Sequence, residues 1–429
     1  MTKSGQAPRL AALQLVDGVT IRKRLLSELT RETLARLPDE ERARALRLAT
    51  SGLRWMDRAD RLLGPHLKKR PPPEVLNMLR LATAELFVDG SAAHGVVHSY
   101  VDIARGTPRS RPFSGLINAV LRKVSASPPE TWAALPLPRM PKWLRKPLLA
   151  DYGKPVIEAM EAAHAKGAPL DLTVKADPQE WAERLGGQVT PTGSVRLQDN
   201  AQVSALAGFG AGSWWVQDAA AALPARLLAA QPGEKVLDMC AAPGGKTMQL
   251  AATGAKVTAL DLSAKRMDVL RENLARTGLN ADLVTEDALY FAGGPFDAIL
   301  LDAPCSATGT IRRHPDLAHA KTGEGFPELF ALQEKMLDHA IGLLKPGGRL
   351  VYCTCSLLFD EGEEQINDLK LRMPDIRVDT GVAERLGLPA EWQVSQGLRT
   401  RPDHWPDTGG MDGFFMTLLQ KPADWQISS

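Results

Sequence analysis

The 429-residue sequence has few cysteines and no long hydrophobic run. None of its four cysteines forms a Cys-x-x-Cys pair, which argues against a disulfide framework and against a zinc module. No stretch is long and apolar enough to span a bilayer, and no apolar segment follows the basic residues near the N-terminus as in a signal peptide. We therefore expect a cytoplasmic protein with no membrane partner. No oligomer signal is visible, so we expect a monomer.

Two common nucleotide-binding motifs are also missing from the most conspicuous loop, residues 235–247. Gly245-Lys246-Thr247 imitates the end of a Walker A loop, but Cys240 stands where that loop needs its first glycine. The fingerprint Gly-x-Gly-x-x-Gly is absent as well. The loop still joins an apolar run to a helical pattern, and Asp261 ends a second apolar run about 20 residues on, where an acid holds ribose hydroxyls. An adenosyl ligand without a pyrophosphate, such as S-adenosylmethionine, fits this pattern. A structural strand and turn is the alternative.

The net charge of the whole chain is +2, but positive and negative residues are distributed unevenly between its N-terminal and C-terminal parts. Residues 1–150 carry 26 Lys and Arg against 13 Asp and Glu, which favours a polyanionic partner such as RNA. A helical domain with solvated arginine faces is the alternative. The short basic segments of this region are residues 22–24, 68–70, 109–111 and 122–123. Phosphate contacts from such segments give affinity without sequence specificity, which then depends on RNA shape.

The hydrophobic pattern predicts a multidomain protein. Apolar residues at spacings of three and four predict an all-α bundle over residues 1–126, with helices over 10–16, 21–37, 40–63, 74–88, 93–105 and 115–124. Five prolines within residues 128–141 indicate a linker over 127–141. We expect a small α/β unit over 142–213, which is a lid or a further RNA-contacting platform. Residues 214–422 then form an α/β Rossmann-like domain.

That C-terminal domain alternates strands and helices, as a parallel sheet covered on both faces requires. The expected strands are residues 235–238, 256–260, 281–285, 298–302 and 349–353. Ligands bind beyond the carboxyl ends of such strands. The reactive and acidic side chains at these ends are Asp238, Cys240, Asp261, Asp287, Asp302, Cys305, Cys353 and Cys355. A preference of cysteine for buried strands is the alternative explanation for the thiols.

Two of these turns suggest a reaction. Asp302-Ala303-Pro304-Cys305-Ser306 follows one strand and Thr354-Cys355-Ser356 follows the next, so their thiols could face one pocket. Pyrimidine C5 is a poor nucleophile, but addition of a thiolate at C6 gives C5 enamine character. One cysteine as nucleophile and a second to assist release satisfy this scheme, and Asp302 could hold the amidine edge of cytosine.

Four segments together carry a family resemblance. Residues 240–246, 302–306, 354–356 and 410–415 closely resemble the motifs of the Sun-type RNA cytosine-5 methyltransferases, in the expected order and spacing. The N-terminal region, most clearly residues 113–122, resembles the helical domain of the NusB-type antitermination factor. This combination is similar to the bacterial enzymes that methylate a cytosine of 16S ribosomal RNA.

The resemblance implies site residues and partners. Cys355 is then the nucleophile, and Cys305 assists release of the product. The residues implied to line the S-adenosylmethionine site are Cys240, Ala241, Ala242, Pro243, Gly244, Gly245, Lys246, Asp261, Asp287 and Asp302, and Asp302 is a candidate for contact with the base. No metal is implied. The implied partner is 16S rRNA or a small-subunit precursor. A transfer RNA methyltransferase and a non-catalytic ribosome assembly or antitermination factor are the alternatives.

Overall fold

The computed structural model describes residues 5–198 and 202–425, and the chain divides into two compact units. The first comprises Met1–Lys166 together with Ile311–Gly323, and the second comprises Gly167–Thr310 and Glu324–Ser429. The short segment Ile311–Gly323 thus contacts the helical unit, although it lies within the sequence range that we expected to be the C-terminal domain.

The first unit is helical, as its sequence pattern predicts. Its α-helices are α1 (Gln6–Thr20), α2 (Leu26–Leu34), α3 (Asp39–Arg54), α4 (Met56–Leu63), α5 (Pro73–Phe87), α6 (Ala93–Gly106), α7 (Ser114–Ser125), α8 (Pro129–Ala133), α9 (Lys142–Lys166) and α14 (Leu317–Ala320). Three expected helices are wrong in extent. The helix expected over 10–16 spans Gln6–Thr20. The helix expected over 40–63 breaks at Trp55, whose backbone is not helical. The helix expected over 21–37 begins only at Leu26, because Lys23 has a φ of 56°.

Helix α5 forms the centre of this unit, because its residues from Val75 to Glu85 are all buried. The segment 127–141, which the sequence suggests is a linker, is mostly exposed but is attached to this core through Trp132 and Leu135. Its helix α8 places Trp132 at 5.8 Å from Trp55 and 5.5 Å from Phe87, measured between ring centroids. Burial of these aromatic rings ties the segment to the bundle.

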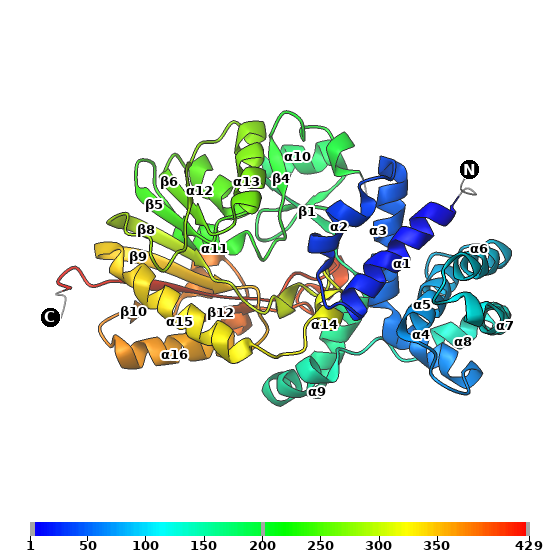
Figure 1. Ribbon diagram of the computed structural model, residues 1–429. Helices are drawn as coiled ribbons and strands as arrows, with labels where there is room; N and C mark the ends of the chain where they lie inside the picture. Colours follow the sequence, from blue (N-terminus) through cyan, green and yellow to red (C-terminus); the bar gives the residue numbers. More distant parts are fainter. Residues whose placement is uncertain (1–4, 199–201, 426–429) are drawn as a thin grey trace. The chain divides into compact units, whose positions relative to one another are not determined.

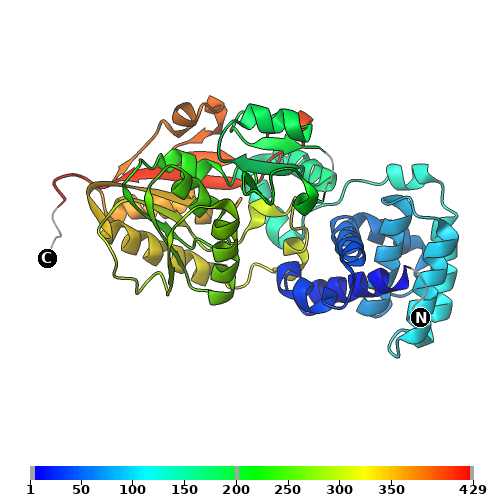
Figure 2. The same ribbon diagram turned by 90° about the horizontal axis from the view of Figure 1, so that it is seen from above.

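The segment Ile311–Gly323 is held by the helical unit through polar contacts as well. A carboxylate oxygen of Asp316 accepts a hydrogen bond of 2.9 Å from the Leu26 amide, at the start of α2. Lys23 Nζ donates to the His319 carbonyl at 2.8 Å, and His319 Nε2 lies 2.9 Å from the Leu53 carbonyl. Figures 1 and 2 show α14 next to α1, in agreement with these contacts.

The second unit begins with a small antiparallel sheet of order β2-β3-β1-β4. Its elements are β1 (Leu170–Val174), α10 (Pro178–Leu185), β2 (Gln188–Val189), β3 (Val195–Leu197) and β4 (Trp214–Val216). Asp171 and Arg196 form a buried ion pair of 2.7 Å within it. The sequence pattern did not predict β4, which pairs with β1 and so places Trp214 and Trp215 in this sheet.

The large sheet has the order β11-β12-β13-β9-β8-β5-β6-β7, with β10 beside β13. Its strands are β5 (Lys235–Met239), β6 (Lys256–Asp261), β7 (Asp282–Thr285), β8 (Phe296–Asp302), β9 (Leu344–Thr354), β10 (Arg377–Val378), β11 (Gln393–Val394), β12 (Gly397–Thr400) and β13 (Phe414–Gln420). The strands from β5 to β9 are parallel, as expected. The complete sheet is mixed, because β13, which the sequence pattern did not predict as a strand, pairs with β9 in the antiparallel sense.

Helices cover both faces of this sheet. They are α11 (Leu223–Leu228), α12 (Gly245–Ala252), α13 (Ala264–Thr277), α15 (Phe326–Gly342), α16 (Glu363–Arg372) and α17 (Val382–Leu386). Figure 1 shows α12 and α13 on one side and α15 and α16 on the other. Each face has its own buried apolar cluster, so the central strands are apolar on both sides.

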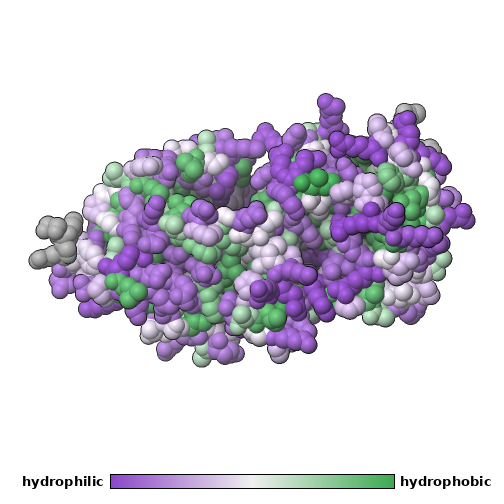
Figure 3. Space-filling model, turned by 60° about the horizontal axis from the view of Figure 1, so that its bottom comes forward, coloured by the Kyte–Doolittle hydropathy of each residue, from purple (hydrophilic) through white to green (hydrophobic). Residues whose placement is uncertain are grey.

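The molecular surface is largely hydrophilic on the face shown in Figure 3, where hydrophobic residues form separate patches. Within residues 5–198 and 202–425, we find no helix with the length and apolar character needed to cross a membrane.

Candidate active site

The parallel strands bring the predicted chemical groups to one edge of the sheet. Strand β5 lies between β6 and β8, and β9 lies on the other side of β8, so the turns that follow these strands are neighbours. Lys246 Nζ lies 2.7 Å from Asp302 Oδ2, and the Sγ atoms of Cys305 and Cys355 lie 3.3 Å apart. The carboxyl-edge rule for α/β sheets therefore places these four residues correctly.

The loop from Cys240 to Lys246 turns sharply between β5 and α12. Cys240 and Gly244 both have left-handed backbones, with φ of 65° and 104°. A Cβ at Gly244 would lie 2.9 Å from the Leu270 side chain, so glycine is required there for close packing as well as for its φ. The Ala241 amide donates to the Leu260 carbonyl at 3.0 Å, which fixes the loop to β6.

Asp261, at the end of β6, helps to hold this loop. Its carboxylate accepts hydrogen bonds from the amides of Ala242 at 3.1 Å and Ser263 at 2.9 Å, and it pairs with Arg266 at 3.2 Å. Each carboxylate oxygen has two lone pairs, so acceptor capacity remains for a ligand hydroxyl. Asp287 follows β7, the neighbouring strand, and caps its own turn by accepting from the Leu289 amide at 3.0 Å.

Asp238, at the end of β5, is completely buried. Its Oδ2 accepts a hydrogen bond of 2.5 Å from Thr247 Oγ1, which fixes the start of α12. Burial raises the pKa of Asp238 to about 7. Its Oδ1 is buried with no hydrogen-bond partner among the residues that the structure describes. This orphaned acceptor, together with Asp261, fits a ligand that presents amino and hydroxyl donors, as S-adenosylmethionine does.

Lys246 is nearly buried and remains charged. Burial alone would lower its pKa, but the Asp302 carboxylate and the nearby thiols outweigh burial, and the pKa of Lys246 is raised. Its Nζ also lies 5.3 Å from the centre of the Phe414 ring, which brings the C-terminal motif to the site. Lys246 thus provides a fixed positive charge beside Asp302.

The two central cysteines differ in their surroundings. The hydrogen bond to Cys355 and burial together raise the pKa of Cys305 well above its usual value. Cys305 therefore retains its proton and can donate it to the Cys355 sulfur. Both residues remain partly exposed, which a nucleophile requires.

The other two cysteines are poor candidates for nucleophiles. Burial raises the pKa of Cys240 and of Cys353 well above the usual range of a thiol. Cys353 is completely buried in β9, and its thiol lies 3.5 Å from Asp302 Oδ1. Both residues stay protonated, so only the pair of Cys305 and Cys355 combines exposure with a thiol partner within residues 5–198 and 202–425.

The sequence pattern did not identify Glu361, a buried carboxylate behind both cysteine turns. Its Oε1 accepts from the Ser306 amide at 2.8 Å and from Gln333 Nε2 at 2.9 Å, and its Oε2 accepts from the Ser306 hydroxyl. Its carbonyl accepts from Tyr352 at 3.0 Å and from Thr354 at 2.9 Å. Glu361 therefore connects the turn after β8 with the end of β9.

A buried ion pair supports the second turn in the same way. Arg399 pairs with Glu363, and its Nη1 donates to the Ser356 carbonyl at 2.8 Å. Three further acids lie near Glu361 in the sequence, at positions 360, 363 and 364, so spacing from Cys355 alone could not single it out.

Two glycines bring the C-terminal motif against the first cysteine turn. The Gly413 amide donates to the Gly309 carbonyl at 2.8 Å, and the Gly309 amide donates to the Cys355 carbonyl at 3.0 Å. A side chain at Gly309 would collide with the Gly413 backbone. The close approach explains why residues 410–415 and the cysteine turns form one site.

Comparison with known proteins identifies the family. The model described as 16S rRNA methyltransferase RsmB/F matches residues 225–420, and the NusB family model matches residues 6–126. Ribosomal RNA small subunit methyltransferase B of Xanthomonas campestris is 35% identical over 443 residues, which cover 98% of each chain. The chain belongs to the RsmB/F family. The protein of the same name from Pseudomonas putida is 36% identical over 97% of this chain and 99% of the relative.

Solved structures agree with the fold of this RsmB/F family member. The crystal structure of PH0851 superposes with a TM-score of 0.76 at 22% identity, over 98% of this chain and 100% of that chain. A methyltransferase homologue from Pyrococcus horikoshii gives a TM-score of 0.54 at 28% identity, over 66% of this chain and 95% of that chain. The chain is thus an S-adenosylmethionine-dependent RNA methyltransferase, and the predicted family, fold class and cofactor are confirmed.

Proposed function

We propose that this RsmB/F protein methylates C5 of a cytosine in small-subunit ribosomal RNA through a covalent adduct with Cys355. The observation that carries the proposal is the 3.3 Å separation between the Sγ atoms of Cys305 and Cys355, beside Lys246 and Asp302. Methylation at a nucleophilic nitrogen or oxygen does not need two thiols, whereas pyrimidine C5 needs a nucleophile that adds and leaves.

The first step uses the difference between the two thiols. The Cys355 thiolate adds to C6, the C5–C6 electron pair makes C5 nucleophilic, and C5 takes a methyl group. S-adenosylmethionine, when bound, would supply that methyl group as an electrophile and leave as S-adenosylhomocysteine, whose sulfur keeps the electron pair of the broken S–CH3 bond. Before addition, the Cys305 thiol lies within hydrogen-bonding distance of the Cys355 sulfur, with 3.3 Å between the two Sγ atoms.

The release step follows from the same contact. The Cys355 sulfur raises the pKa of Cys305, so formation of the C6–S bond removes this influence. Cys305 then releases its own proton to solvent and, as a thiolate, takes the C5 proton. The C5–C6 double bond re-forms and the C6–S bond breaks, which restores the Cys355 thiolate.

Asp302 and Lys246 would position the base. We propose that the Asp302 carboxylate accepts a hydrogen bond from the exocyclic amine of cytosine, while Lys246 fixes the orientation of that carboxylate at 2.7 Å. The loop from Cys240 to Lys246, together with Asp261 and Asp287, would hold the cofactor.

Ribosomal RNA is the favoured substrate because the relatives that match nearly the whole chain are named small-subunit methyltransferases. We propose that the helical region, residues 1–126, binds this RNA through its basic surface. Transfer RNA is the alternative substrate, because the catalytic motifs are shared by enzymes that act on different RNAs. The non-catalytic alternative conflicts with the assembled cysteine pair.

The test uses total RNA from a strain that lacks this protein, incubated with the purified chain and labelled S-adenosylmethionine. We expect label in 16S rRNA, recovered as 5-methylcytosine after digestion to nucleosides. Label in transfer RNA would change the substrate, and a different methylated nucleoside would refute the C5 chemistry. No label in any RNA would favour the non-catalytic alternative.

A further inference from the structure

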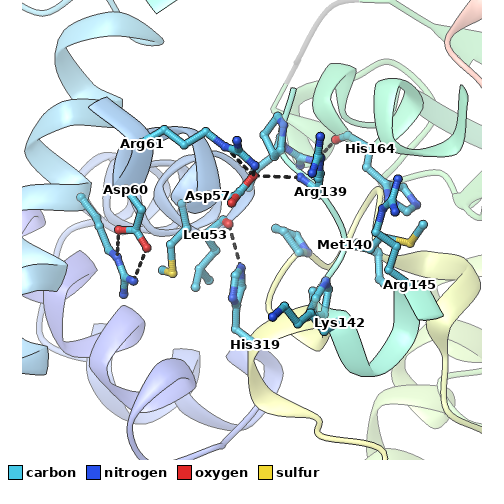
Figure 4. Close-up of a pocket in the computed structure, with 18 residues that line it drawn as sticks. Leu53, Asp57, Asp60, Arg61, Arg139, Met140, Lys142, Arg145, His164 and His319 are labelled. Carbon is cyan, nitrogen blue, oxygen red and sulfur yellow. Dashed lines mark hydrogen bonds and ion pairs between the residues drawn. The ribbon is translucent and has the colours of Figure 1, made fainter. Parts of the chain in front are cut away.

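A cavity of about 530 Å³ lies within the first unit, whereas the cysteine pair belongs to the second. One wall is formed by α3, α4 and α5, a second by residues 138–145 and the end of α9, and a third by the segment Ile311–Gly323. Figure 4 shows its lining side chains converging from these three parts of the chain. The volume lies within the range of small-ligand pockets, roughly 300–1,000 Å³.

Several cations of this cavity are already neutralised. The pairs, with their shortest distances, are Arg61 with Asp57 at 3.1 Å, Arg80 with Asp60 at 2.6 Å, and Arg145 with Glu161 at 2.8 Å. Asp57 also accepts from the Arg139 amide at 3.2 Å, which fixes the backbone of the second wall (Figure 4). These pairs build the walls and leave their carboxylates occupied.

Three further cations have no carboxylate partner in the described part of the chain. Arg139 and Lys142 are exposed at the mouth, where their charges face solvent. Arg54 lies deeper, and its Nη1 donates only to carbonyls, those of His164 at 2.9 Å and Arg312 at 2.8 Å. Burial and the charge of Arg312 lower the pKa of Arg54 to about 10. Arg54 is partly buried, and a cation in such a place without a counter-charge costs free energy that a bound anion would offset.

The floor of the cavity is apolar and carries imidazole rings. Its hydrophobic lining includes Leu53, Met56, Met140 and Ile311, all buried. His319 is held there by its contact with the Leu53 carbonyl (Figure 4). Apolar and ring surfaces accept the face of a nucleobase, while guanidinium and ammonium groups at the mouth accept phosphate.

We propose that this cavity binds one unstacked nucleotide of the RNA substrate, with its base on the apolar floor and its phosphates on Arg139 and Lys142. The inference rests on the proposed RNA substrate and adds a second contact point, whose lining residues all belong to the first unit and not to the unit that holds the cysteines. A single nucleotide drawn out of a loop or bulge gives specificity for RNA shape, which scattered basic segments cannot give.

The first test compares two double variants of the full chain with equal loss of charge. Arg139→Gln/Lys142→Gln removes both charges at the mouth. Lys370→Gln/Arg377→Gln removes two exposed charges of the second unit, outside the proposed RNA-binding region, and is the matched control. Affinity for a labelled 16S rRNA fragment is measured at several salt concentrations.

Loss of two single-strand phosphate contacts lowers the slope of log K against log salt by about 1.4. We expect this change in the mouth variant and less than half of it in the control. Equal changes in both variants, or no change in either, would refute the binding of an RNA nucleotide in this cavity.

The second test locates the base directly. The wild-type chain is irradiated with 16S rRNA that contains 4-thiouridine, and the cross-linked peptides are mapped. We expect cross-links within residues 53–61, 138–145 or 311–319, and their absence from all three walls would refute the proposal. Methyl transfer is measured with the same preparation. Cross-links without methylation contradict the proposed function alone, whereas methylation without cross-links in these walls contradicts the pocket alone.

Discussion

Glu361→Gln tests how a buried carboxylate holds the two cysteine turns. The change keeps the shape of the side chain but replaces one acceptor oxygen with a donor amide. Glu361 makes three side-chain hydrogen bonds, two to Ser306 and one to Gln333. A glutamine oxygen can keep the two bonds of Oε1 without their charge, but the amide at the Oε2 position obliges the Ser306 hydroxyl to accept and to turn its proton toward Thr308 or Ser356. Hydrogen bonds to charged groups contribute roughly 1.5–3 kcal/mol and neutral ones roughly 0.5–1.5 kcal/mol.

Weakening three such bonds would cost about 3 kcal/mol in total. The lower cost of burying a neutral amide offsets part of that loss, which leaves a decrease of about 1–3 kcal/mol in the free energy of unfolding. The effect on rate comes from geometry, because the Ser306 amide adjoins Cys305. A displacement of about 1 Å at a reacting group lowers the rate by about 100-fold.

The assay measures kcat and KM for methyl transfer, with thermal unfolding of the same preparations. We expect kcat to fall by about 10–100-fold. KM for S-adenosylmethionine should be unchanged, because Glu361 makes no contact with the loop from Cys240 to Lys246 among the hydrogen bonds of the described residues. Glu364→Gln, the same change at an exposed position of α16, is the matched control and should behave as wild type. A Glu361→Gln chain with normal kcat and an unchanged unfolding temperature would refute the positioning role.

Three further predictions concern single ionisable side chains. Lys246→Met removes the partner of Asp302 and should lower kcat by about 100-fold or more, and Lys246→Arg should recover part of the loss. Single-turnover methyl transfer measures the rates of both variants. Full activity of Lys246→Met would contradict the role of Lys246 in orienting Asp302. Asp238 has a folded-state pKa raised to about 7, so the folded state binds more protons than the unfolded state between about pH 4 and 7, and stability falls as pH rises through that window. Urea unfolding at pH 5 and pH 8 should show a smaller loss in Asp238→Asn than in wild type, and equal losses would refute this assignment. Asp316→Ala removes the acceptor for the Leu26 amide and should lower the free energy of unfolding of the helical unit by about 1 kcal/mol, measured by urea titration; no change would show that the contact is not stabilising.

The elements with strong local patterns could be predicted from the sequence. Helices α5, α6 and α7 lie within about one residue of their predicted bounds at each end, because apolar spacing and flanking prolines act locally. The parallel strands and their carboxyl-end groups were predicted for the same reason. The rule that places ligands at those ends brought Lys246, Asp302 and the cysteine pair together without any knowledge of side-chain contacts.

The remaining features depend on contacts between distant residues. Strand β13 was noted only as a motif, because its buried apolar run gains its strand character from pairing with β9. The segment Ile311–Gly323 belongs to the helical unit only through contacts such as the one between Asp316 and Leu26. Glu361 reads as an ordinary surface acid in an acidic stretch, and only its burial behind Ser306 reveals its position.

The cytosine-C5 reaction is tested most directly by trapping its covalent intermediate. Wild type, Cys305→Ala, Cys355→Ala and the double variant are each incubated with 16S rRNA and S-adenosylmethionine, then denatured and separated by electrophoresis. Without Cys305, the C5 proton is not removed and the C6–S bond persists. We predict a denaturation-resistant adduct of protein and RNA with Cys305→Ala that disappears in the double variant, and neither adduct nor methyl transfer with Cys355→Ala. An adduct with Cys355→Ala that is absent from Cys305→Ala would contradict the assignment of the nucleophile.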